Sequence, residues 1–134
     1  MGALILDASV LIGLLDSADP HHHRAIDDVE SADHAERPVL VPASAYSAAL
    51  VAFARAGRVR DARDAIAAMG IAVAPLTPEI AETAAELRAR HERLRQPDAM
   101  VLASAREVDG DLLSYDERLT QLAGDRSVAR QRPG

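Results

Sequence analysis

Ala3-Leu4-Ile5-Leu6-Asp7 is the stretch of sequence that decides the fold. Its apolar residues form a continuous run rather than an alternating one, which is typical of a strand covered on both faces of a parallel sheet. The run stops at Asp7, and the residues from Ser9 to Asp16 then have the pattern of a short helix. The start of the chain therefore predicts a strand followed by a helix, as in an α/β fold.

The rest of the chain continues this alternation. Further short strands are predicted at residues 39–41, 71–74 and 112–114. Helices are predicted at about residues 21–35, 43–56, 58–69, 77–96, 97–109 and 116–123. The helix at 43–56 is so rich in apolar and small residues that we expect it to be buried on several sides. Strands that alternate with helices in this way predict a parallel sheet flanked by helices.

Composition indicates one globular domain without disulfides. The chain has 134 residues, of which 49% are hydrophobic, and it contains no cysteine. We expect a single domain over residues 1–124 and a polar tail over residues 125–134 that carries Arg126, Arg130 and Arg132. The first apolar run is short and has no basic leader, which predicts a cytoplasmic protein with no membrane span.

The charge balance argues against a protein whose whole surface grips nucleic acid. The formal net charge is −6, and every one of the 15 basic residues is arginine because lysine is absent. An RNA contact would therefore have to be local. One candidate is a cluster of arginines before residue 98, formed by Arg88, Arg90, Arg93 and Arg95. A solvated helix face explains this cluster equally well.

Three aspartates fall at the ends of predicted elements. Asp7 follows the first strand, Asp116 follows the fourth, and Asp98 lies in the first turn of a helix. Each alone is a common helix cap, but ligands of open parallel sheets bind at the carboxyl ends of the strands. Carboxylate oxygens select Mg²⁺, with Mn²⁺ as a possible substitute. Ser9 and Ser114 each lie two residues from an aspartate and can either orient a carboxylate or cap a turn.

Three blocks of sequence resemble the PIN-domain ribonucleases, and within them the VapC toxins of toxin-antitoxin systems. The blocks are Ile5-Leu6-Asp7-Ala8-Ser9, then Pro97-Asp98-Ala99-Met100-Val101-Leu102-Ala103, then Leu112-Leu113-Ser114-Tyr115-Asp116. The resemblance extends over nearly all of the chain. It implies a three-layer PIN-like fold, with a parallel sheet of four to five strands and about seven helices.

The resemblance also implies a chemistry and partners. Proteins of this kind are Mg²⁺-dependent endoribonucleases whose acidic residues hold the metal, here Asp7, Asp98 and Asp116. The metal activates water for attack on the RNA backbone and leaves a 5′-phosphate and a 3′-hydroxyl. A VapB antitoxin and a homodimer are implied as well.

The chain departs from the family pattern at Ala48, where a glutamate is expected. No Asp or Glu occurs between Glu36 and Asp61, so a shift of the alignment cannot supply it. The alanine has three explanations: a deliberate replacement that disables the protein, a natural loss, or a residue that only serves its Ala-rich helix. The first two predict a catalytically impaired ribonuclease.

Two other function classes compete with a nuclease. A phosphoacceptor domain with Asp7 or Asp116 as acceptor usually needs a lysine, and a P-loop also needs one, so the lack of lysine argues against both. A non-catalytic PIN-fold module that binds an antitoxin or RNA stays open. The run His21-His22-His23 is not expected to hold one metal, since consecutive helical residues point in different directions.

Overall fold

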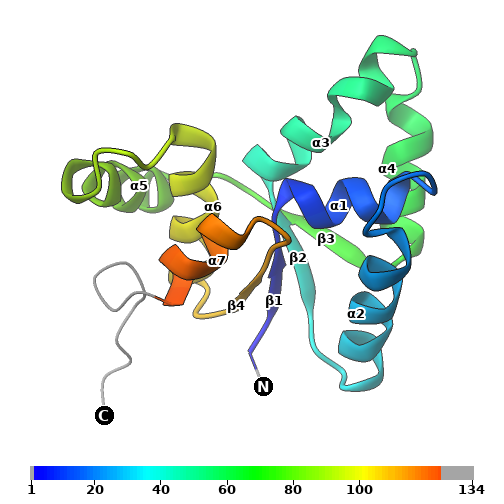
Figure 1. Ribbon diagram of the computed structural model, residues 1–134, viewed down its shortest axis with the longest axis horizontal. Coiled ribbons are helices and arrows are strands. Elements are labelled where there is room, and N and C mark those ends of the chain that lie inside the picture. Colours follow the sequence, from blue (N-terminus) through cyan, green and yellow to red (C-terminus); the bar gives the residue numbers. More distant parts are fainter. Residues whose placement is uncertain (1, 125–134) are drawn as a thin grey trace.

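The computed structural model describes residues 2–124, which form a parallel sheet with helices on both sides (Figure 1). The four strands are β1 (Leu4–Leu6), β2 (Val39–Pro42), β3 (Ile71–Ala74) and β4 (Asp111–Leu113), in the order β3-β2-β1-β4. The helices are α1 (Ala8–Leu15), α2 (His22–His34), α3 (Ala43–Arg55), α4 (Val59–Ala68), α5 (Pro78–Arg90), α6 (Gln96–Glu107) and α7 (Glu117–Gly124). The predicted three-layer PIN-like α/β fold is confirmed. The arginines predicted in a tail lie outside the described residues.

The continuous apolar run at the start of the chain forms a central strand. β1 pairs in parallel with β2 on one side and with β4 on the other, and Leu4 is opposite both Val39 and Asp111. Helices α1, α2 and α4 lie to one side of the sheet in Figure 1, and α5, α6 and α7 lie to the other. Because both faces are covered, Ile5 and Leu6 are almost completely buried.

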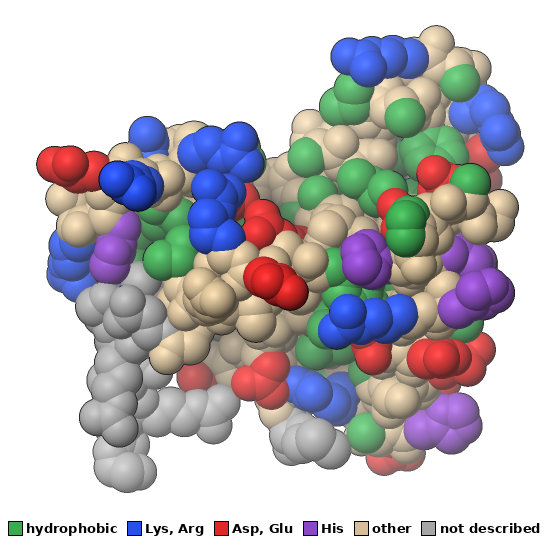
Figure 2. All heavy atoms as spheres, in the orientation of Figure 1, with side chains coloured by type: hydrophobic (Ala, Val, Ile, Leu, Met, Phe, Trp, Pro, Cys, Tyr) green, Lys and Arg blue, Asp and Glu red, His purple; other side chains and the backbone are tan. Residues whose placement is uncertain are grey.

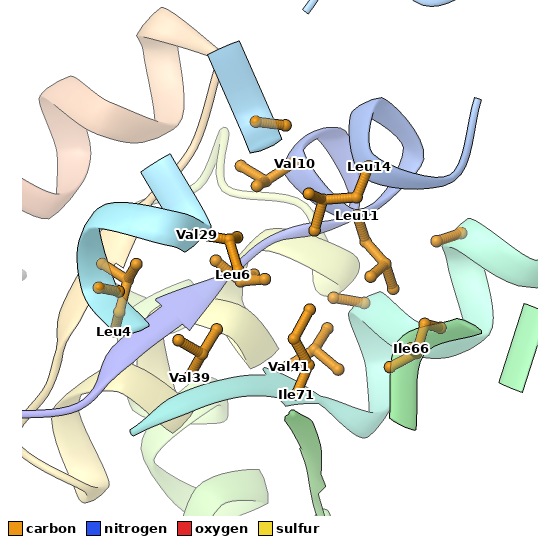
Figure 3. Close-up of a cluster of buried hydrophobic side chains, with 14 of the residues drawn as sticks. Leu4, Leu6, Val10, Leu11, Leu14, Val29, Val39, Val41, Ile66 and Ile71 are labelled. Carbon is orange, nitrogen blue, oxygen red and sulfur yellow. The ribbon is translucent and has the colours of Figure 1, made fainter. Parts of the chain in front are cut away.

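Two clusters of buried side chains hold the layers together. The first cluster joins the sheet to α1 and α2 and includes Leu6, Val10 and Leu11 (Figure 3). The second cluster is built mainly from α5, α6 and α7 and includes Leu87 and Leu119. Burial of one such side chain contributes roughly 1.5–3 kcal/mol to folding. The two clusters together place the carboxyl ends of β1 and β4 between the helical layers.

Helix α6 contributes to both clusters. Its Val101 packs in the first cluster, while Ala99, Leu102 and Ala103 pack in the second. The helix therefore presents apolar side chains in two directions, which explains why the sequence from Ala99 to Ala105 is almost entirely apolar or small.

Two predictions about the helices were wrong. The helix predicted to reach residue 96 ends at Arg90, because the chain turns to bury Leu94 in the second cluster, and this burial outweighs local helix propensity. Helix α3 is buried along one face, at Ala45, Ala49 and Leu50, rather than on several sides. Its other face is open, and Val51 is 44% exposed.

No helix among residues 2–124 is both long enough and apolar enough to cross a membrane.

Candidate active site

Asp7 is a buried carboxylate fixed by its neighbours. It follows β1 as the N-cap of α1, and it is 5% exposed. Its Oδ1 accepts hydrogen bonds from the Ser9 hydroxyl at 2.6 Å and from the Val10 backbone N–H at 3.2 Å. Its Oδ2 accepts a hydrogen bond from the Ser114 hydroxyl at 2.5 Å. A buried carboxylate with both oxygens occupied in this way has a fixed orientation.

The same two serines join the loop after β1 to the loop after β4. The Ser9 hydroxyl oxygen accepts a hydrogen bond from the Tyr115 backbone N–H at 3.1 Å. The Ser114 hydroxyl oxygen accepts one from the Asp116 backbone N–H at 3.0 Å. Each hydroxyl thus donates to Asp7 and accepts from the opposite loop. This arrangement brings two of the predicted aspartates to the same edge of the sheet.

Asp116 has a structural role in addition to its place at this edge. Its Oδ1 accepts hydrogen bonds from the backbone N–H groups of Arg118 at 3.0 Å and Leu119 at 3.4 Å. These contacts cap the first turn of α7, as expected for an aspartate at a helix start. The Asp116 side chain is still 40% exposed, so its other oxygen remains accessible to solvent.

Asp98 lies across from these residues in the first turn of α6. Its side chain is 18% exposed, and the Arg118 guanidinium lies 3.5 Å from its carboxylate and 4.0 Å from that of Asp116. Burial raises the pKa of Asp98, while the positive charges of Arg95 and Arg118 oppose this shift. The negative charges of Asp116 and Asp7 add to the rise in the pKa of Asp98. The three predicted aspartates are therefore close enough to influence one another.

The donor set suits a hard divalent cation that keeps much of its water. Within residues 2–124, no three Asp, Glu, His or Cys side chains converge closely enough to hold one ion among themselves. Mg²⁺ does not need such a cage, because it commonly binds one or two carboxylates and completes its shell with water and phosphate oxygens. In this structure the positively charged guanidinium of Arg118 lies between the carboxylates of Asp98 and Asp116. The residues therefore fit Mg²⁺ held through water, provided that Arg118 moves aside.

The four arginines predicted to contact RNA differ in their surroundings. Arg88 donates hydrogen bonds to the Leu94 carbonyl at 3.1 Å and to the Gln96 side-chain oxygen at 2.8 Å, so it fastens the turn after α5. Arg90 and Arg93 line a hollow of about 690 Å³ that also includes Asp98 and Arg118.

Arg95 is the N-cap residue of α6, beside Asp98. Figure 2 shows basic side chains gathered over this part of the molecule, next to acidic ones. The hollow combines an acidic edge with a basic wall.

Ala48 lies on the open face of α3. It is exposed, and it lines a groove of about 530 Å³ between α1 and α3, together with Ile12 and Ala52. Burial therefore does not require a small side chain at this position. A glutamate at position 48 would have room for its side chain.

The three consecutive histidines have different contacts, and one of them packs against Tyr115, the residue before Asp116. His22 forms a hydrogen bond through Nδ1 with the Gly13 carbonyl at 2.7 Å, and His23 contacts the His22 ring edge-on. The His21 ring packs against the Tyr115 ring at a tilt of 32°, with ring centroids 4.7 Å apart. Sequence reasoning missed His21 as a site residue, because no local spacing connects it with Tyr115.

The fold and its acidic edge define an α/β domain that gathers carboxylates at the carboxyl ends of its parallel strands. The sequence matches the PIN domain family over residues 4–125, and the chain therefore belongs to that family. Among curated proteins, no relative matches the sequence.

Three solved structures are similar to the chain. The Mycobacterium tuberculosis toxin VapC20, a sarcin-ricin loop cleaving toxin, has 21% identity and a TM-score of 0.68, covering 89% of this chain and 94% of its own. A toxin-antitoxin complex from Klebsiella pneumoniae has 19% identity and a TM-score of 0.73, covering 96% and 97%. VapBC2 from Rickettsia felis, bound to a promoter DNA fragment, has 8% identity and a TM-score of 0.72, covering 90% and 92%. At these identities the likeness concerns the fold.

Proposed function

We propose that this protein is a Mg²⁺-dependent endoribonuclease of the VapC toxin type. The observation that carries the proposal is that Asp7 and Asp116 lie close enough to Asp98, at one edge of a PIN-family sheet, to raise its pKa. Two further observations support it: the basic wall of the adjacent hollow suits a polyanion, and VapC20 is a sarcin-ricin loop cleaving toxin. The similarity to toxin-antitoxin complexes supports a VapB-type antitoxin as partner, and a cytoplasmic homodimer is part of the same proposal.

The three aspartates would hold Mg²⁺, or Mn²⁺ in its place, directly or through water. The bound metal supplies an activated water and stabilises negative charge on the phosphate. Asp7 keeps its orientation through Ser9 and Ser114, so its position does not depend on the metal. Arg95 and Arg118 provide positive charge near Asp98, where it can attract the RNA backbone. None of these residues needs to act as a nucleophile.

The chain as it stands is expected to be impaired because position 48 carries alanine. Two carboxylates about 4 Å apart repel by roughly 1–4 kcal/mol when no cation is bound. A cation relieves this repulsion, so an additional carboxylate would strengthen cation binding. Replacing Ala48 by glutamate should therefore lower the metal-free stability and increase the stabilisation by Mg²⁺. Thermal unfolding of both proteins in EDTA and in Mg²⁺ measures this. An equal response to Mg²⁺ would count against a fourth metal-binding acid at position 48.

The alternative is a non-catalytic module that binds an antitoxin or RNA. The absence of any acid between Glu36 and Asp61 favours this reading for the present sequence. It shares the fold and the partners of the first proposal but predicts no cleavage under any condition.

Cleavage of structured RNAs separates the two proposals. The test compares the chain with Ala48, Ala48→Glu, and Ala48→Glu combined with Asp98→Asn, each in Mg²⁺ and in EDTA. Asp98→Asn is the matched control, because it keeps the shape of the side chain and removes the charge. The ribonuclease proposal expects cleavage by Ala48→Glu alone, with 5′-phosphate ends, and loss of that cleavage in EDTA and in the double variant. If Ala48→Glu neither cleaves RNA nor binds Mg²⁺, the module is the better description.

A further inference from the structure

A second hollow lies next to the aspartates, on the side away from α5. It has a volume of about 400 Å³ and is lined by side chains from α2, α7 and the loop after β4. Those side chains are His21, Arg24, Ser114, Tyr115, Glu117, Thr120 and Gln121. Ser114 connects this hollow with the aspartate site, since it lines the hollow and its hydroxyl donates a hydrogen bond to Asp7. The hollow is therefore joined to the aspartate site through Ser114, and an RNA strand bound at that site would pass close to the hollow.

The Tyr115 ring has two partners in this hollow, the His21 ring and the Arg24 guanidinium. The His21 ring lies 4.7 Å from the Tyr115 ring, and the Arg24 guanidinium carbon lies 4.5 Å from the centre of the same ring. The Tyr115 hydroxyl donates a hydrogen bond to Asp28 at 2.8 Å, and its backbone N–H donates to Ser9. Tyr115 is thus held by α2 through its hydroxyl and by Ser9 through its backbone N–H.

The Arg24 guanidinium places a positive charge next to the Tyr115 ring. It is exposed, and among residues 2–124 its guanidinium makes no ion pair with a carboxylate. Asp28 is engaged by Tyr115 instead. Glu117, Thr120 and Gln121 also line the hollow, and their polar groups can form hydrogen bonds to the edge of a base.

We propose that this hollow is a nucleotide subsite for single-stranded RNA, in which Arg24 contacts a backbone phosphate and the planar groups of His21, Tyr115 and Arg24 support a base. Single-stranded RNA is recognised by such stacking on aromatic rings and guanidinium planes, combined with hydrogen bonds to base edges. The subsite rests on the proposed ribonuclease function for its substrate, and it extends that function by a recognition element that lies outside the three aspartates.

Binding of a short fluorescein-labelled single-stranded oligoribonucleotide, measured by anisotropy in EDTA, tests the subsite without cleavage. Arg24→Ala should weaken binding by at least about fivefold, as expected for the loss of one stacked base. It should also reduce the slope of log affinity against log salt by about 0.7, as expected for the loss of one phosphate contact. Arg24→Lys should keep the slope but lose part of the affinity, because lysine has the charge and not the plane.

Arg63→Ala is the matched control. Arg63 is exposed on α4, which does not line the hollow, and its replacement removes the same charge. Thermal unfolding of each variant checks that the fold is intact. If Arg24→Ala binds RNA as tightly as Arg63→Ala does, the subsite is refuted. The same holds if the unchanged protein does not bind the oligoribonucleotide.

Photocrosslinking with an iodouridine-substituted oligonucleotide provides a second readout. Peptides containing His21 or Tyr115 are expected among the crosslinked products, and crosslinks confined to α5 and α6 would overturn the proposal. Both measurements read binding alone, so failure of Ala48→Glu to cleave RNA would refute the ribonuclease and leave the subsite standing.

Discussion

The strand side and the helix side of the aspartate site are built differently. On the strand side, Asp7 is 5% exposed and receives three hydrogen bonds from fixed neighbours. On the helix side, the side chains of Asp98 and Asp116 are 18% and 40% exposed, and Arg118, itself 57% exposed, lies between them. The strand side is set during folding, whereas the helix side can adjust when a cation arrives. A site with one fixed and one adjustable wall can bind metal without a fully formed cage.

The largest effect is expected from Asp7→Ala. This change removes the N-cap of α1 and leaves the Ser9 and Ser114 hydroxyls without their acceptor. Together these losses should lower the free energy of unfolding by about 2–4 kcal/mol. Urea denaturation in EDTA measures the change, with Asp7→Asn as the isosteric control that should lose less. If Asp116→Ala proves as damaging as Asp7→Ala, the proposed difference between the two walls is wrong.

Ser114→Ala should have the next largest effect. It removes the hydrogen bond to Asp7 and the acceptor for the Asp116 N–H, and a hydrogen bond to a charged group contributes about 1.5–3 kcal/mol. A double-mutant cycle with Asp7→Asn should give a coupling energy of at least about 0.5 kcal/mol. Simple additivity of the two changes would mean that Ser114 does not position Asp7.

Asp98→Asn should change stability in a way that depends on pH. Because the pKa of Asp98 is raised in the folded protein, ionisation of this carboxyl costs more in the folded state than in the unfolded state. That cost is absent below about pH 4, where both states are protonated, and it is complete once the pH exceeds the folded-state pKa. The asparagine variant should therefore gain stability relative to the natural protein as the pH rises from about 3 to 7.

Denaturation in EDTA at several pH values measures this difference. Its sign should reverse at neutral pH when Mg²⁺ is added, because only the natural side chain offers a carboxylate to the metal. A difference that does not vary with pH would show that burial of Asp98 has little energetic effect.

Arg118→Ala should have the smallest effect on stability. Its two ion pairs are exposed and long, so their loss should change the free energy of unfolding by less than about 1 kcal/mol. The same variant should be stabilised more strongly by Mg²⁺, because no guanidinium then competes for Asp98 and Asp116. Arg106→Ala on α6 is a control with the same change in charge. Weaker stabilisation by Mg²⁺ in Arg118→Ala than in this control would show that Arg118 assists the metal.

The sequence predicted the sheet well because its strands are short apolar runs with few alternatives. The apolar residues at 4–6 and 71–74 form strands, as predicted. Asp7 and Asp98 lie at the starts of helices, where the sequence placed them. The end of α5 was missed because it depends on the burial of Leu94, a tertiary contact that outweighs local propensity.

The contacts within the candidate site were harder to predict, because they join distant parts of the chain. The hydrogen bond from Ser114 to Asp7 spans 107 residues, and the one from Tyr115 to Asp28 spans 87. Arg118 lies in the last helix, and no spacing rule links it to Asp98. Only the parallel arrangement of β1 and β4 brings these side chains together.

Because α6 packs in both hydrophobic clusters, it should be the last of the helices around the second cluster to unfold locally. Asp98 is carried by this helix, and Leu112 is the residue of β4 that packs against both clusters. A transient opening of the second cluster would loosen α5 and α7 first and leave α6 attached through Val101. Amide hydrogens of α5 should then exchange with solvent faster than those of α6. In that partly open state Asp98 would stay in place on α6, while Arg90 and Arg93 would move away from it with the end of α5.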